Sequence, residues 1–210
     1  MKKLILCLLL ISPCFLFAQI GFKAGVNFAN VSKASSINNS SRTGFHAGLL
    51  LGSSKGIISS RTELLFSRQG YDYKSGTNTG SVNLDYIMLP QTMSINITKY
   101  FSLMIGAQAA FLLNAKVDSS TNGGGGSGSE IMDFYNRFDY GYGAGVEIHP
   151  VSGLLIGAKL NISLAKLYKD AASGQMPSFS SIDMKNNLFQ IFTGWRFGGK
   201  SKKKDKEKDN

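Results

Sequence analysis

The stretch FDYGYGAGVEI, residues 138–148, decides the fold class. Every second residue from Phe138 onward is aromatic or aliphatic, and the residues between them are glycine or acidic. This period of two predicts a β-strand with one apolar face and one polar face. Glycines make up most of the second face, which is unlike the strongly charged open face of a soluble sheet. The composition therefore favours a strand whose apolar face contacts lipid.

Seven further segments show the same alternation, and their apolar sets begin at Ile20, Phe45, Leu64, Leu84, Phe101, Leu154 and Phe189. In the fourth of the eight segments we expect Leu84, Tyr86 and Met88 to face outward. Asp85 and Gln91 then face inward. Each segment spans about 10 to 14 residues, and a tilted strand needs about 9 to 11 to cross a bilayer. We therefore predict an all-β fold, an eight-stranded antiparallel up-and-down transmembrane β-barrel.

The connections between these segments alternate between long and short. Long polar segments follow the first, third, fifth and seventh strands, at residues 31–42, 70–81, 115–133 and 166–185. Short turns follow the second, fourth and sixth strands, near residues 53–55, 98–100 and 150–152. Because outer-membrane barrels have short periplasmic turns and long outer loops, we expect both termini in the periplasm. A soluble sandwich or lipocalin-like barrel, with its apolar faces turned inward, is the alternative.

A targeting segment precedes the first strand. Two lysines stand before an apolar run at residues 4–17, and small Ala18 precedes Gln19. This order is typical of a secretory signal peptide, so we assign residues 1–18 to the signal peptide and 19–198 to the barrel. Both cysteines fall within the leader, which leaves the mature chain without a thiol. Lipidation of Cys14 is the weaker alternative, because a proline precedes it.

The chain is basic overall, and its C-terminal segment contributes part of this charge. The formal net charge is +10, and residues 200–210 carry six lysines against three acidic residues. A segment without apolar residues cannot form a core, so we expect 199–210 to be a disordered charged periplasmic tail. The alternative is a tether that binds peptidoglycan or another anionic periplasmic partner. Because an exported protein does not routinely meet nucleic acid, the charge favours outer-membrane lipid and lipopolysaccharide as partners.

The polar faces of the predicted strands collect charges that would lie in the lumen. The set is Lys23, Arg61, Glu63, Asp85, Arg137, Asp139, Glu147, Lys159 and Arg196. Its five cations nearly balance its four carboxylates. An eight-stranded barrel is only wide enough for its own side chains, and buried charges are tolerated when paired. We therefore predict a filled lumen, with a narrow porin or small-solute transporter as the alternative.

Aromatic residues stand near the ends of the predicted strands. They are Phe22, Phe45, Phe101, Phe138, Tyr140, Trp195 and Phe197. Because aromatic girdles mark both membrane interfaces of outer-membrane barrels, we assign these residues to the girdles. Many such barrels end on the aromatic residue of the last strand, which the barrel-insertion machinery reads. Here thirteen residues follow Phe197.

The sequence carries little that points to catalysis, a metal or a cofactor. We expect His46 near the outer end of its strand and His149 in a periplasmic turn, too far apart to share a metal. A serine nucleophile needs an imidazole base, and the chain has no G-x-S-x-G turn. The acidic residues of the third long loop lack the ligand spacing of a calcium loop; they are Asp118, Glu130 and Asp133. We predict no enzyme, no catalytic residue and no cofactor; a lipid-modifying enzyme is the least favoured alternative.

Several stretches in order resemble one known family. They are IGFKAGVNFANV at 20–31, RTELLFSRQGYDY at 61–73, LDYIMLPQTMSIN at 84–96, YGYGAGVEI at 140–148 and GWRFG at 194–198. Together they resemble the PorT-like outer-membrane β-barrel family of the Bacteroidetes, over essentially the whole predicted barrel. The resemblance implies an eight-stranded barrel in the cell outer membrane and suggests an association with secretion or assembly. We therefore expect a non-enzymatic structural or interaction protein.

Overall fold

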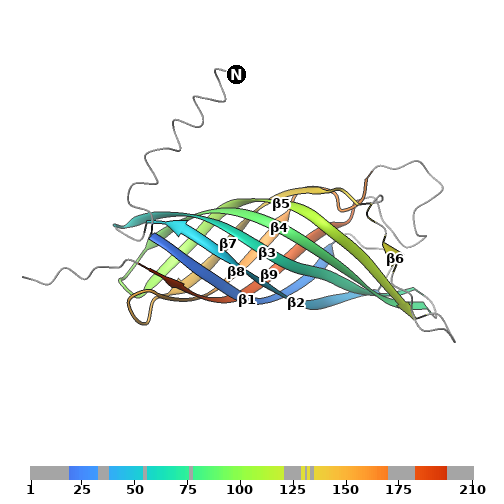
Figure 1. Ribbon diagram of the computed structural model, residues 1–210, viewed down its shortest axis with the longest axis horizontal. Helices are drawn as coiled ribbons and strands as arrows, with labels where there is room; N and C mark the ends of the chain where they lie inside the picture. The colour runs from blue at the N-terminus through green and yellow to red at the C-terminus, as the bar shows by residue number, and fades with distance from the viewer. Residues whose placement is uncertain are drawn as a thin grey trace, which may run out of the picture.

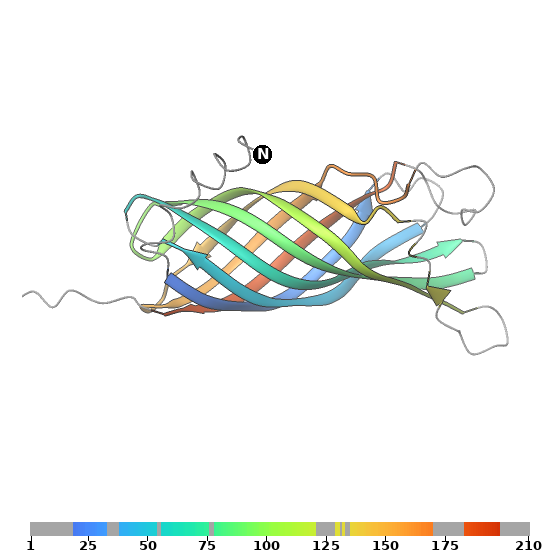
Figure 2. The ribbon, with the colours of Figure 1, turned by 45° about the horizontal axis from the view of Figure 1, so that its top comes forward.

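The computed structural model describes residues 19–32, 38–53, 56–75, 78–120, 129–130, 132, 135–169 and 183–197. Within these residues, eight long strands run obliquely around one axis and close into a ring (Figure 1 and Figure 2). They are β1 (Gln19–Ser32), β2 (Asn38–Gly52), β3 (Ile58–Ser75), β4 (Asn78–Asn96), β5 (Phe101–Ser120), β7 (Phe138–Ile148), β8 (Leu154–Ser163) and β9 (Lys185–Arg196). The predicted eight-stranded antiparallel barrel is confirmed.

Consecutive long strands pair with one another, and the first pairs with the last. The order is β4, β3, β2, β1, β9, β8, β7 and β5, and a β4–β5 pairing closes the ring. The pairing between the first and last strands, β1 and β9, runs from Gly21 opposite Arg196 to Ser32 opposite Lys185. The short strand β6 (Ser129–Glu130) pairs with β5 at Lys116 and Val117, near the C-terminal end of β5. Among the described strands, closure leaves no free edge in the body of the barrel, which removes the risk of edge-to-edge association.

The apolar faces point away from the barrel axis, as predicted for seven of the eight strands. On β7 the exposed residues are the aromatic and aliphatic set that starts at Phe138. The expectation for β4 was wrong: Leu84, Tyr86 and Met88 are buried inside the barrel. This part of β4 is apolar on both faces, since Ile87 and Leu89 lie opposite Tyr86 and Met88, so alternation alone could not choose between them.

Three strands are longer than predicted. β3, β4 and β5 have 18, 19 and 20 residues, and together they form what we call the extended end of the barrel (Figure 2). The predicted loop at 70–81 is therefore mostly strand, because β3 continues to Ser75 and β4 begins at Asn78. The reason is that Tyr71 and Tyr73 keep the strand alternation going and bury their rings inside the barrel.

The opposite end, which we call the terminal end, carries the short connections and both ends of the described barrel. The short connections follow Gly52, Asn96 and Ile148, where β2, β4 and β7 end, close to the predicted positions. Gln19 and Phe197 lie at this same end, where the backbone N–H of Phe197 donates to the carbonyl of Ile20 at 2.8 Å. The predicted signal peptide and tail lie outside the described residues. In the part of the chain described, the structure has no helix of the length and hydropathy that crossing a membrane requires.

Candidate functional site in the barrel lumen

The lumen near the extended end is filled by apolar side chains around three tyrosines. The Tyr71 and Tyr168 hydroxyls lie 2.6 Å apart, and those of Tyr135 and Tyr168 lie 3.2 Å apart. All three side chains are fully buried. Burial raises the pKa of Tyr135 and of Tyr168, so both hydroxyls stay protonated and available as donors. The surrounding side chains include Val31, Leu65, Val82, Leu84, Tyr86, Met88, Leu112, Met184 and Leu188. We call this group the tyrosine core.

Two connecting segments hold the tyrosine core in place. The Asn136 amide donates to the carbonyls of Lys166 and Tyr168 at 2.8 and 2.9 Å. The backbone N–H of Leu167 donates to the carbonyl of Met184 at 2.7 Å. These bonds satisfy polar groups that would otherwise be buried without partners. The segments are therefore fixed across the extended end of the lumen.

A layer of uncharged polar side chains lies below the tyrosine core. Asn27 is at its centre: its amide donates to Ser67 at 2.9 Å, and its oxygen accepts from Gln190 at 3.0 Å. The same oxygen lies 2.8 Å from Nδ1 of His46, which therefore carries the hydrogen. His46 is opposite Gly25, in the middle of β1. The expectation that His46 lies near the outer end of the barrel was wrong, because β2 extends further than its apolar pattern indicated.

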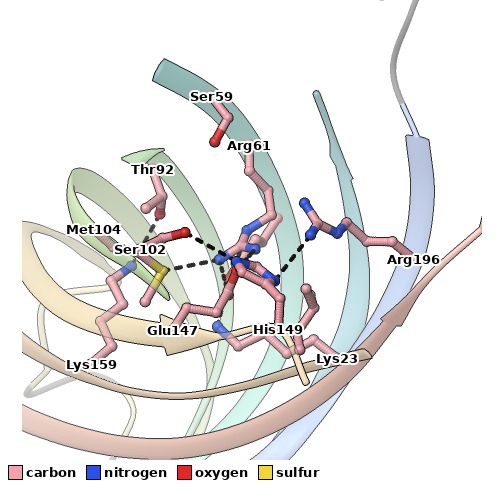
Figure 3. Close-up of polar contacts among 12 residues, drawn as sticks. Lys23, Ser59, Arg61, Thr92, Ser102, Met104, Glu147, His149, Lys159 and Arg196 are labelled. Carbon is pink, nitrogen blue, oxygen red and sulfur yellow. Dashed lines mark hydrogen bonds and ion pairs between the residues drawn. The ribbon is translucent and has the colours of Figure 1, made fainter. Parts of the chain in front are cut away.

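Ion pairs fill the half of the lumen nearest the terminal end (Figure 3). Glu63 lies 2.9 Å from Lys23 and 2.9 Å from Arg61. Arg61 also donates to both oxygens of Glu147, at 3.1 and 2.8 Å. These four side chains are almost completely buried. Paired contacts of this kind offset the cost of removing the charges from water.

His149 connects this ion-pair network to the terminal end. Nδ1 of His149 lies 3.2 Å from the Arg196 guanidinium, which can only donate. Nε2 therefore carries the hydrogen, and it lies 3.4 Å from Glu147 and 3.1 Å from Ser102. Burial is the main cause that lowers the pKa of His149, and it is assisted by the two nearby arginines. His149 was not among the predicted lumen residues, although its two-residue spacing from Glu147 places both on one face.

Two lysines of the network lack a carboxylate of their own. Lys159 is buried and donates to the hydroxyl of Thr92 at 3.4 Å. Lys23 shares Glu63 with Arg61 and lies 3.9 Å from the centre of the Phe192 ring. An aromatic face partly compensates a buried ammonium. Both lysines thus add positive charge that is only partly balanced.

The structure brings together six of the nine predicted lumen charges. These are Lys23, Arg61, Glu63, Glu147, Lys159 and Arg196. Asp85 is not among them, because it alternates with the buried Leu84 and Tyr86 and so faces the outer wall, where it pairs with Arg68 at 2.7 Å. Arg137 is exposed at the extended end, and Asp139 accepts from Ser163 there at 2.6 Å. Among the described residues the network therefore has four cations for two carboxylates, which corrects the predicted near-balance.

A cavity of about 710 Å³ opens at the terminal end, and we call it the terminal mouth. It is lined by Gln19, Gly56, Ile57, Asn96, Ile97, Thr98, Lys99, Tyr100, His149, Pro150, Val151, Ser152, Gly153 and Arg196. All three short turns contribute to this lining. The terminal mouth is thus a cup above the ion-pair network, on the axis of the barrel rather than on its wall.

The predicted girdle residues fall into two groups on the outer wall. Phe22, Trp195 and Phe197 are exposed near the terminal end, where the Phe22 and Phe197 rings lie 6.0 Å apart. Phe138 and Tyr140 are exposed nearer the extended end, and Phe45 is exposed near the middle of β2. Phe101 is half-buried at the start of β5. Their contact with the membrane interfaces stays a prediction.

Ser102 and His149 lie within hydrogen-bond distance, but their surroundings differ from those of a catalytic pair. A hydrolase base has its second nitrogen oriented by a carboxylate, whereas Nδ1 of His149 faces Arg196. Ser102 is fully buried and donates to Asn96 at 2.6 Å. In the described part of the chain no three acidic, histidine or cysteine side chains are grouped closely enough to hold a metal. Of the calcium candidates, Asp118 accepts from Asn83 at 3.1 Å, and Asp133 lies outside the described residues.

Comparison with known proteins agrees with this architecture. Residues 13–169 match the family described as outer membrane protein beta-barrel domain. The solved structure of Neisserial surface protein A is 12% identical, with a TM-score of 0.54 over 86% of this chain and 99% of that chain. The attachment invasion locus protein Ail of Yersinia pestis is 19% identical, with a TM-score of 0.49 over 87% and 100%. The likeness to Neisserial surface protein A, at this identity, shows the fold alone. No curated protein sequence matches the chain.

Proposed function

The chain belongs to the outer membrane protein beta-barrel domain family, and we propose that it is a non-conducting barrel that acts as a structural or interaction protein. As a member of this family it is an outer-membrane β-barrel protein. The proposal concerns what the barrel does there. It also includes the finer likeness to PorT-like proteins and a role associated with secretion or assembly, which rest on the motif order alone.

The tyrosine core is the observation that carries this proposal. A pore needs a continuous water-filled path, whereas the lumen here holds buried tyrosine, leucine and methionine side chains at the extended end. The ion-pair network occupies the other half. An eight-stranded barrel has no spare width once its interior is filled. The packing therefore favours an interaction role over the narrow porin that is the alternative.

The proposed orientation places the terminal end in the periplasm and the extended end outside the cell. The short turns and both ends of the described barrel share the terminal end, as outer-membrane barrels require of their periplasmic side. Cleavage of a signal peptide after residue 18 and a periplasmic tail at 199–210 belong to the same proposal. Outer-membrane lipid and lipopolysaccharide would then contact the apolar wall, and the barrel-insertion machinery would act on β9.

The extended end offers the surface that would contact a partner outside the cell. Arg42 on β2 pairs with Asp72 at 2.6 Å and donates to Asn83 at 2.8 Å. Asn83 in turn donates to Asp118 on β5. This polar network lies on the outer face of the strands at the extended end. Nearer the terminal end, the same outer face carries apolar side chains. A polar face of this kind suits a soluble partner and does not suit lipid chains.

Conductance in planar bilayers tests the closed lumen. We expect no stable openings from the protein extracted from outer membranes. Tyr71→Ala and Tyr168→Ala together remove two rings of the tyrosine core and should produce openings, whereas Tyr142→Ala on the exposed wall should not. Variants are compared only where the band still shifts on heating, which shows a folded barrel. Stable openings from the unaltered protein would overturn the proposal in favour of a pore.

A further inference from the structure

We propose that the terminal mouth binds a small water-borne anion of the periplasm through its carboxylate or phosphate group. The inference rests on the proposed function, because it takes the terminal end to face the periplasm. The argument comes from the charge of the lumen, the lining of the cavity and its place on the barrel axis.

The ion-pair network behind the terminal mouth carries an excess of positive charge. Its four cations meet two carboxylates, both of which are engaged: Glu63 by Lys23 and Arg61, and Glu147 by Arg61. The partner that Arg196 has within the network is the neutral His149. Uncompensated charge in an enclosed site attracts a counter-ion of opposite sign. An anion at the terminal mouth would supply the missing negative charge.

The charged side chains that line the terminal mouth are also positive. Lys99 and Arg196 line it from opposite parts of the sequence, and none of the described lining residues is acidic. Lys99 is exposed and lies 4.7 Å from the centre of the Tyr100 ring, which holds its side chain at the rim. Cleavage after residue 18, as proposed above, places the α-amino group of Gln19 on the same lining. A guanidinium and an ammonium, both of which line this cup, are donors that bind carboxylates and phosphates.

The position of the cavity selects a water-borne ligand over a membrane lipid. The cup lies within the ring of turns, whereas the bilayer surrounds the outer wall. A phospholipid would have to leave the bilayer to reach Arg196. The volume of about 710 Å³ is in the range of small-ligand sites. It suits a short acidic peptide, such as a cell-wall stem peptide, or an organic phosphate.

Equilibrium titration of the extracted protein tests the site, with the fluorescence of Trp195, the single tryptophan, as a reporter beside the cup. The probes are a tri-glutamate peptide, the tri-glutamine peptide of the same length, and inorganic phosphate. We expect tri-glutamate to bind and tri-glutamine not to bind. The affinity should fall as salt is raised, because the contacts are charged. Binding of phosphate as well, or of phosphate alone, would identify which anion the site prefers.

Three substitutions locate the binding. Arg196→Gln should weaken tri-glutamate binding about 10-fold, which is the loss of one charge-assisted contact. Lys99→Gln, at an exposed position where folding is not at risk, should weaken it about 3-fold. Lys74→Gln is the matched control, because Lys74 is exposed at the extended end, and it should leave binding unchanged. Heat-modifiable migration verifies the fold of each variant.

Two results would overturn the inference. One is that neither tri-glutamate nor phosphate binds, or that the two peptides bind with the same measurable affinity. The other is binding that survives both mouth substitutions and disappears when residues 199–210 are deleted, which would assign the anion to the tail. Planar-bilayer conductance is measured in parallel, so that failure of one proposal can be told from failure of the other. Charge-selective binding in a barrel that conducts would overturn the proposed function and leave the anion site standing.

Discussion

Glu147 shows at the scale of single residues how the lumen tolerates buried charge. Its two oxygens accept both terminal nitrogens of Arg61, and one of them lies 3.4 Å from His149. Nearly all of its surface is removed from water. A buried ion pair of this kind contributes little compared with apolar packing, but removal of one partner strands the other charge. The residue scale therefore predicts an asymmetric response to substitution.

Glu147→Gln should destabilise the folded barrel by about 3 kcal/mol, because the Arg61 charge loses its main partner in a closed site. Urea unfolding in detergent, followed by the heat-modifiable band, measures the change. Asp72→Asn is the matched control: it breaks a partly exposed ion pair and should cost less than about 1 kcal/mol. Equal costs for the two variants would show that water reaches the ion-pair network.

His149 gives the barrel a dependence on pH near neutrality. Its pKa is lowered from 6.5 in the folded protein, mainly by burial, so the unfolded chain takes up the proton first as pH falls. The free energy of unfolding should therefore be constant above about pH 7 and should decrease as pH falls below 6.5. Thermal melts of the protein and of His149→Gln across this range measure the effect. The substitution should remove part of the slope, and an unchanged slope would assign it to another group.

Glycine on β7 shows, at the scale of a whole element, why one face of a strand must be small. Gly141, Gly143 and Gly145 all face the lumen, between the charges at either end of the strand. A Cβ atom at Gly143 would lie 2.3 Å from the Asn161 side-chain oxygen and 2.9 Å from Cε of Lys159. The glycines therefore make room for the polar side chains of β8. The apolar face of β7 is under no such restriction.

Gly143→Leu should destabilise the barrel by about 3 kcal/mol or prevent its folding, because the new side chain overpacks the lumen. Ala144→Leu, one residue away on the exposed face, should be tolerated. The fraction of each variant that migrates as the heat-modifiable folded form measures the difference. Comparable folding of the two variants would contradict a packed lumen at this level.

The whole molecule is closed by the pairing of its first and last strands. The β1–β9 ladder ends at Arg196, and one further backbone bond joins Phe197 to Ile20. Together with the β4–β5 ladder, this pairing completes the ring without residues 199–210. The tyrosine core and the terminal mouth then lie at opposite ends of one axis. The barrel thus has a filled end and an open end, which is the basis of both functional proposals.

Deletion of residues 199–210 should leave the stability of the barrel within about 0.5 kcal/mol, because no described contact of the ring needs them. Insertion into the outer membrane should be retained, since the chain would then end close to the aromatic Phe197. Urea unfolding and the heat-modifiable fraction in isolated membranes measure the two properties. A large loss of stability would mean that the tail is part of the folded barrel.

Alternation along the sequence was sufficient to predict the barrel, its eight strands and the facing of most of them. The prediction holds because the period of two is a local property of each strand, and lipid on one side makes it easy to see. It failed at β4, where residues on both faces are apolar, and it ended β3 too early, since Asp72 and Lys74 look like loop residues. In both places the local pattern does not tell whether a side chain will face the lumen or the outside of the barrel.

The composition of the lumen could be read from the sequence, but its pairing could not. Alternation identified Lys23, Glu63 and Glu147 as inward-facing, because the face on which a residue lies depends only on its own strand. Pairing depends on the register between strands and on bulges, which depend on the whole ring. The tertiary structure alone removed Asp85 from the lumen, added His149 and formed the tyrosine core from distant segments. The sequence by itself thus determined which faces meet lipid, and closure of the ring decided which charges meet each other.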